Sequence, residues 1–193
     1  MGTRNVTIIR FNGQEKVRQY GQWDGFPTTA LASIVKFLKT DGVIEKLKNN
    51  LHKCALIPED NFQYPDNFGR IGNGIIKHHL FLRELNYDER IDKVVEVLEV
   101  SRDDVFNYYL ATRDTGYTIP NLLVTSMADK ADEIILKKAY TNKCDWQIEA
   151  VNIIDLDASR ITSIWHGETM TWDFDCLPDD DEIKKFEHDD EED

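Results

Sequence analysis

Residues 5–20 of the chain, NVTIIRFNGQEKVRQY, decide how the fold begins. Two runs rich in β-branched and aromatic residues, 5–11 and 16–20, lie on either side of the pair Asn12-Gly13. An Asn-Gly pair between such runs is the strongest short-range signal for a hairpin, because both residues accept the positive φ angles of its turn. The sequence therefore predicts a β-hairpin over residues 4–21.

The stretch that follows, GQWDGFPTTALASIVKFL at residues 21–38, changes from strand to helix. Glycines and Pro27 end the second strand, and Thr28 or Thr29 is a suitable N-cap. The apolar residues after the cap recur with helical spacing: Leu31, Ile34, Val35 and Leu38. After a short break, the same spacing predicts a second helix over residues 42–52.

The middle of the chain is less regular. Residues 55–75 are interrupted by proline and glycine and are predicted to form a long irregular segment, which in compact domains is often functional. The next segment, IIKHHLFLREL, favours either a strand or a short helix. Strand character is expected near 94–100, Ser101 is expected to cap a helix, and 118–127 is expected to form another short helix.

The last third of the chain predicts three strands and a helix. The segments 146–157 and 160–165 alternate as strands do, and residues 168–174 form a third such segment. Pro178 and the acidic residues after it predict a helix at about 179–187. The whole reads as an α+β fold, with an N-terminal β-hairpin and C-terminal antiparallel strands in a sheet packed against central helices.

Length and composition predict one globular domain. A chain of 193 residues with 41% hydrophobic and 31% charged residues is long enough to bury a sizeable core. No window is apolar enough for a membrane span, and the N-terminus has no export signal. Three cysteines without CxxC spacing are typical of reduced thiols, so a cytoplasmic location is expected, in the bacterial host if a phage encodes the chain.

The net charge of −13 is concentrated at the C-terminus. The last residues, DDDEIKKFEHDDEED, are strongly acidic, and we expect a single domain over 1–187 followed by a disordered acidic tail over 188–193. The chain has no basic stripe, and its charge repels phosphates. Direct binding to nucleic acid is therefore not expected, whereas a basic protein partner is compatible with the charge.

Three segments that lie far apart in the sequence each resemble a motif of one group of proteins. They are Tyr20-Gly21-Gln22-Trp23-Asp24-Gly25-Phe26-Pro27, Arg113-Asp114-Thr115-Gly116 and Ile154-Asp155-Leu156-Asp157. Together they resemble a broad group of short bacterial and phage proteins, mostly of unassigned function, which carry a Y-x-Q-x-D-G-Y-P segment after an N-terminal hairpin. This chain departs from the group at residues 28–30, where threonines and an alanine replace glycines. The resemblance implies a related architecture and a phage or prophage origin, and it brings no established activity.

The segment before the first helix has the residue types that hold a nucleotide-like molecule. A helix N-terminus offers free backbone N–H groups, aromatic rings stack on a base, and polar side chains form hydrogen bonds. Arginines elsewhere in the chain are available for a phosphate. The candidate ligand-binding residues are Tyr20, Gln22, Trp23, Asp24, Thr28, Arg70, Arg113 and Asp114. The alternative is that the segment is a structural corner with core aromatics and a turn.

No catalytic residue, metal site or cofactor is predicted, because no nucleophile–base pair or metal-ligand spacing is legible. The first functional hypothesis is a non-enzymatic binding protein, a phage counter-defence protein that sequesters a small nucleotide-derived immune signal. The alternative is an acidic inhibitor that mimics phosphates and occupies a nucleic-acid-binding groove on a host defence protein. A nucleotide-processing enzyme is the third hypothesis, and a homo-oligomer is left open.

Overall fold

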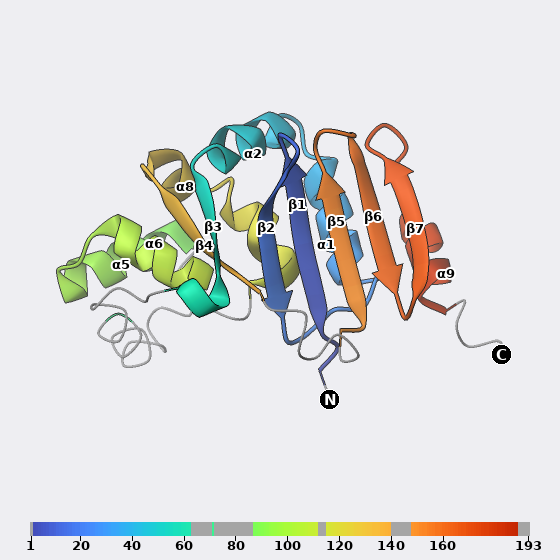
Figure 1. The fold of residues 1–193 in the computed structure, drawn as a ribbon, viewed down its shortest axis with the longest axis horizontal. Helices are drawn as coiled ribbons and strands as arrows, with labels where there is room; N and C mark the ends of the chain where they lie inside the picture. The colour runs from blue at the N-terminus through green and yellow to red at the C-terminus, as the bar shows by residue number, and fades with distance from the viewer. Residues whose placement is uncertain (1, 63–70, 72–86, 112–114, 140–147, 189–193) are drawn as a thin grey trace.

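The computed structural model describes residues 2–62, 71, 87–111, 115–139 and 148–188 (Figure 1). Its centre is a five-stranded sheet in the order β2-β1-β5-β6-β7. The strands are β1 (Asn5–Phe11), β2 (Gln14–Gly21), β5 (Ala150–Asp155), β6 (Arg160–Trp165) and β7 (Glu168–Asp173). The predicted α+β fold, with an N-terminal hairpin and C-terminal antiparallel strands, is confirmed.

The hairpin forms where the Asn-Gly pair predicts it. Asn12 and Gly13 have φ angles of 54° and 68°, as the tightest hairpin turns require. The β1–β2 register shifts between Ile9 and Arg10, which is the position of a β-bulge. The turn and the register of the hairpin are therefore formed by residues 5–21.

A parallel pairing joins the two ends of the chain. β1 pairs with β5 from Asn5 opposite Ala150 to Arg10 opposite Asp155. β5, β6 and β7 then continue as an antiparallel meander. The hairpin and the C-terminal strands thus form one sheet rather than two.

Helices cover one face of this sheet. α1 (Ala30–Leu38) and α9 (Asp180–His188) lie behind the sheet in Figure 1, and α2 (Val43–Leu51) lies across its end. The face of α1 toward the sheet is apolar because its hydrophobic residues recur with helical spacing, and Leu31 and Ile34 are fully buried. From α9, Ile183 and Phe186 enter the same core.

A second, two-stranded sheet lies beside β2 and was not predicted. β3 (Cys54–Pro58) pairs in parallel with β4 (Ile134–Lys138), and the backbone N–H of Ala139 donates to the carbonyl of Arg18 at 2.9 Å. The expectation of an irregular segment over 55–75 is therefore wrong for its first residues. Their strand forms only through a partner that lies far away in the sequence.

The structure describes six further helices. They are η1 (Glu59–Asn61), α5 (Tyr87–Leu98), α6 (Arg102–Ala111), η2 (Gly116–Thr118), α7 (Ile119–Leu122) and α8 (Ser126–Lys130). The strand expected near 94–100 is wrong, because Ile91, Val94 and Leu98 lie on one face of α5. Ser101 accepts from the N–H of Asp104 at 3.0 Å, as predicted for an N-cap.

The short helix expected over 118–127 is divided into η2, α7 and the start of α8. The whole IIKHHLFLREL segment and the tail after His188 lie outside the described residues. Within the part of the chain that the structure describes, no helix has the length and apolar character needed to cross a membrane.

Candidate functional site

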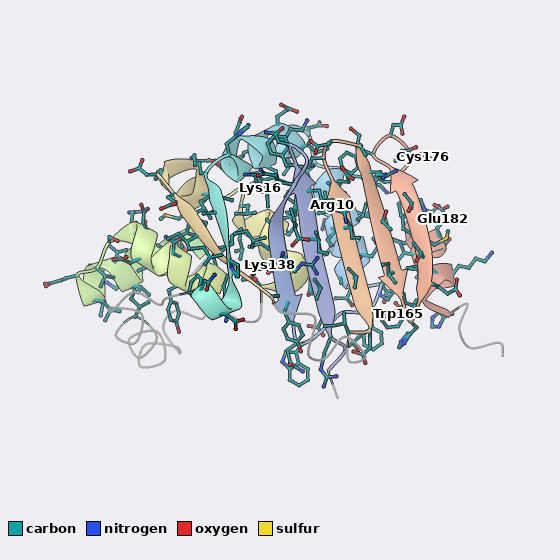
Figure 2. All side chains as sticks on the ribbon, viewed as in Figure 1. Arg10, Lys16, Lys138, Trp165, Cys176 and Glu182 are labelled. Carbon is teal, nitrogen blue, oxygen red and sulfur yellow. The ribbon has the colours of Figure 1, made fainter. Side chains whose placement is uncertain are left out.

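The segment from Tyr20 to Thr28 crosses one end of the large sheet. It leaves β2 at Gly21 and reaches β6, where the ring of Phe26 lies 5.8 Å from the ring of Trp165, labelled at the end of β6 in Figure 2. The hydroxyl of Tyr20 donates to Oε1 of Gln22 at 2.8 Å. Two of the predicted site residues are thus bonded to each other.

Backbone contacts with the first strand fix the corner in this segment. Nδ2 of Asn5 donates to the carbonyl of Trp23 at 3.1 Å, and the N–H of Gly25 donates to the carbonyl of Thr3 at 3.1 Å. Asp24 has a φ of 57°, in the left-handed region that Asp tolerates better than most residues. A Cβ atom on Gly25 would lie 2.9 Å from the Thr3 carbonyl oxygen, so glycine is needed there.

The second segment of the resemblance packs against the first. Oγ1 of Thr115 donates to Oε1 of Gln19 at 2.8 Å, and both residues are buried. A Cβ atom on Gly116 would lie 2.8 Å from Cα of Gly21. Arg113 and Asp114, directly before this contact, lie outside the described residues, as does Arg70. Their role in a phosphate site stays a prediction.

The third segment of the resemblance, residues 154–157, stabilises the β1–β2 turn at the other end of the sheet. The carboxylate of Asp157 accepts from the N–H groups of Asn12 and Gly13, at 2.9 and 2.8 Å. These backbone hydrogen bonds, that of Gly13 first, hold the pKa of Asp157 below its usual value. Ala158 donates to Asp155 at 2.9 Å, which tightens the turn after β5. Asp155 and Asp157 thus have structural roles.

A carboxylate occupies the start of α1. Oε2 of Glu187, from α9, accepts from the backbone N–H of Thr28 at 2.7 Å. Thr29 stands at the N-cap position, but its side chain caps no N–H group. The indole N–H of Trp165 donates to the backbone carbonyl of Glu187 at 3.2 Å and helps to position the end of α9. The N–H of Thr28, expected to be free for an anion, is therefore engaged by the protein itself.

Large aromatic side chains remain exposed around this corner. Trp23 is 60% exposed and Phe26 is 45% exposed, and His166 lies exposed with its ring 4.2 Å from that of Trp165. We call Trp23, Phe26 and His166 the aromatic surface. Burial, and then the negative charge of Asp24, raise the pKa of the Tyr117 hydroxyl.

Beneath the corner, two buried polar atoms lack a partner among the described residues: Oδ1 of Asn5 and Oγ1 of Thr7. Both side chains are fully buried. Such a group costs about 1–3 kcal/mol unless water or another donor reaches it. Asn5 and Thr7 are thus polar positions within the core.

Sequence reasoning missed three residues that shape this site: Asn5, Trp165 and Glu187. Asn5 lies in a predicted strand, and nothing in its pattern marks a side chain that turns inward to hold the Trp23 carbonyl. Glu187 stands among other acidic residues near the end of the chain. Only the packing of α9 against α1 distinguishes it from them.

A shallow hollow at the opposite end of the sheet carries several charges. Its lining residues are Arg10, Gly13, Gln14, Glu15, Asp155, Asp157 and Ala158. The carboxylate of Glu15 already pairs with Arg18 at 2.6 Å and Lys138 at 3.0 Å, and those two cations lower its pKa although its burial raises it. Among the described residues, no cluster of three or more His, Cys, Asp or Glu side chains is arranged to hold a metal ion.

The two described cysteines differ in their surroundings. Cys54 is buried, and this burial raises the pKa of its thiol to about 12, so the thiol stays protonated at neutral pH. Cys176 is exposed, and Cys144 lies outside the described residues. Cys54 is therefore a poor nucleophile in this fold.

Comparison with known proteins finds no match to this chain among protein families, curated proteins or solved structures. The resemblance to a group of bacterial and phage proteins therefore stays a prediction. The candidate site stands on its own geometry: a glycine-dependent corner, a helix start occupied by Glu187, and exposed aromatic rings between them.

Proposed function

We propose that this protein is a non-enzymatic binding protein and that its aromatic surface docks on another protein. The observation that carries the proposal is the bond between Glu187 and the N–H of Thr28. A phosphate group at the start of α1 would have to displace this carboxylate and would meet its negative charge. The corner therefore presents rings and carboxylates rather than an anion-binding cradle.

Exposed aromatic rings of this size favour a protein partner. Trp and Tyr are enriched among the residues that contribute most to the free energy of protein–protein binding, because they bury a large area for little lost side-chain freedom. Trp23 and Phe26 are the two most exposed large aromatic side chains among the described residues. Their burial against a partner gives a reason for residues that add little to the protein's own core.

The charge of the molecule points to a basic partner surface. The chain carries a net charge of −13, and the Asp24 carboxylate stands exposed beside the rings. Arg and Lys side chains of a partner fit such a place, since they bind carboxylates and stack on aromatic faces. The wider role would be inhibition of a host defence protein by occupation of its nucleic-acid-binding groove.

A nucleotide-derived ligand is the second candidate. The neighbouring side chains of Trp23 and Asp24 supply a stacking face and a hydrogen-bond acceptor, as a base and its ribose require. In this case the base and sugar, rather than the phosphate, would contact the described part of the site. The ligand would be a nucleoside-like immune signal.

The two candidates are separated by paired binding experiments. Partners are captured from bacterial lysate with wild-type protein, with Trp23→Ala/Phe26→Ala, and with Val97→Ala, which removes another exposed apolar side chain, on α5. We expect a protein that binds wild type and Val97→Ala and is lost with the double variant. In parallel, nucleosides and nucleotides are titrated against each protein by thermal shift.

A nucleoside that raises the melting temperature of wild type, with no effect on Trp23→Ala/Phe26→Ala, would favour the second candidate. Equal capture of every partner by wild type and both variants would contradict the role of the aromatic surface.

A further inference from the structure

The outer edge of β7 has backbone hydrogen-bonding groups that no described residue pairs. The N–H of Phe174 donates to the carbonyl of Ser159 at 2.8 Å, which makes this a hydrogen-bonded pair of the antiparallel β6–β7 ladder. Such pairs alternate along antiparallel strands. Trp172, Met170 and Glu168 therefore direct their backbone groups toward β6, and Thr169 and Thr171 direct theirs outward.

The opposite edge of the same sheet is covered. There, β2 receives a backbone hydrogen bond from Ala139, and the side chain of Gln19 donates to the carbonyl of Lys137 at 2.8 Å. Figure 1 shows β7 as the outermost strand at the other edge. Within the described ranges, no residue hydrogen-bonds to the outward backbone groups of Thr169 and Thr171.

β7 also lacks three of the features with which proteins usually protect an edge. Its sequence, ETMTWD, contains no proline and no lysine, and its register with β6 has no bulge from Arg160 to Trp165. The strand is anchored from behind, because the ring of Trp172 packs against Phe186 of α9 at 6.0 Å. Nothing in the strand itself therefore blocks the addition of another strand at this edge.

The acidic residues around this edge favour a partner segment with positive charge. Glu168 and Asp173 stand at the two ends of β7, and the first turn of α9 adds Asp180, Asp181 and Glu182. We propose that the β7 edge binds an extended segment of a partner protein that carries Lys or Arg at both ends, as an added antiparallel or parallel strand. A second copy of this chain is a poor occupant, because it brings another acidic strand and another net charge of −13.

The inference rests on strand geometry and not on the aromatic surface, so its test uses different residues. The probe is the synthetic acetylated peptide KTVTVTK, titrated into the full chain and followed by backbone amide NMR. We expect shifts of the amides of β7 and binding that weakens with salt, because the flanking charges are exposed. The matched peptide ETVTVTE is expected not to bind.

Two substitutions of Thr171 give the decisive comparison. Thr171→Pro removes an outward N–H group that the β6–β7 ladder does not use, so the fold should persist. Thr171→Val retains the N–H and, like the proline variant, removes the hydroxyl that lies 3.0 Å from that of Thr162. We expect Thr171→Pro to weaken binding about tenfold, as the loss of one or two hydrogen bonds would, with Thr171→Val unchanged.

If Thr171→Pro fails to fold, a KTVTVTK peptide with N-methylated outward amides tests the same bonds on the wild-type protein. Binding that N-methylation leaves unchanged would overturn the proposal. So would the absence of any amide shift at about 1 mM peptide. A dimer of the chain that dissociates on Thr171→Pro would overturn it in favour of a second copy.

Discussion

The backbone conformation of Asp24 explains why an aspartate is found at this position of the corner. Its φ of 57° is left-handed, and no described residue hydrogen-bonds to its carboxylate. We expect Asp24→Ala to lower the free energy of unfolding by about 1–2 kcal/mol, because alanine is strained at this φ. Asp24→Gly removes the same carboxylate without this strain and should stay within about 0.5 kcal/mol of wild type.

Thermal melts of the two variants test this explanation. Equal losses of stability would show that the carboxylate itself stabilises the corner. The pair also separates folding from binding, since a partner that needs the Asp24 carboxylate loses affinity for both variants alike.

Gly116 is limited by the close approach of two chain segments. It has a φ of 40°, and a Cβ atom there would lie 2.8 Å from Cα of Gly21. Gly42 has a φ of 73° with open space around it. We expect Gly42→Ala to cost about 1–2 kcal/mol from backbone strain, and Gly116→Ala to cost about 1–3 kcal/mol more from overpacking. Chemical denaturation measures both, and equal costs would contradict the tight contact.

At the scale of elements, Asp157 holds the β1–β2 turn through two backbone N–H groups. Its pKa is lower in the folded chain than in the unfolded chain. The stability that it contributes is therefore fully present above its ordinary pKa of 3.8 and is lost as the pH falls through its folded value. We expect Asp157→Asn to be less stable than wild type at pH 7.

The difference between Asp157→Asn and wild type should shrink as the pH falls below the ordinary pKa of aspartate, because the wild-type carboxyl is then protonated as well. Melting temperatures across this acid range check the trend. The control is Asp41→Asn, at an exposed turn position. A gap between Asp157→Asn and wild type that stays constant with pH would contradict the proposed turn contact.

Glu187 connects the last helix to the first. Its carboxylate accepts from the backbone N–H of Thr28, just before α1, although 159 positions separate the two residues in the sequence. We expect Glu187→Ala to lower the free energy of unfolding by about 0.5–1.5 kcal/mol, the usual net contribution of one hydrogen bond. The hydrogen bond from the indole N–H of Trp165 to the backbone carbonyl of Glu187 does not involve the side chain that this change removes.

The control for Glu187→Ala is Asp175→Ala, which removes an exposed carboxylate from the same acidic region. It should change stability by less than about 0.5 kcal/mol. Equal effects of the two variants would mean that net charge, rather than the bond to Thr28, is what matters.

At the scale of the whole molecule, local signals were sufficient for several local elements but not for α5, where a strand was expected. The Asn12-Gly13 turn, the helical spacing after Pro27 and the C-terminal alternation each predict an element that the structure contains. The parallel pairs β1–β5 and β3–β4 could not be predicted this way. Their partners are distant in sequence, and strand propensity depends on the partner surface.

In the candidate site, too, local sequence predicts some features and the packing of distant segments determines others. Tyr20, Trp23 and Asp24 were found because their residue types cluster before a helix. The bond that changes the interpretation of the site, from Thr28 to Glu187, exists only because α9 packs against α1. A helix start therefore cannot be read as an anion site from sequence until the elements that pack beside it are known.

The most direct test of the aromatic surface as a protein-docking site is photo-crosslinking in bacterial cells. A photoreactive phenylalanine analogue is introduced in place of Trp23 or, as a control, in place of Val97, which is exposed on α5. We predict that irradiation links one defined protein to position 23 and not to position 97, and that Phe26→Ala lowers the yield. Equal labelling at the two positions, or none at position 23, would contradict the account.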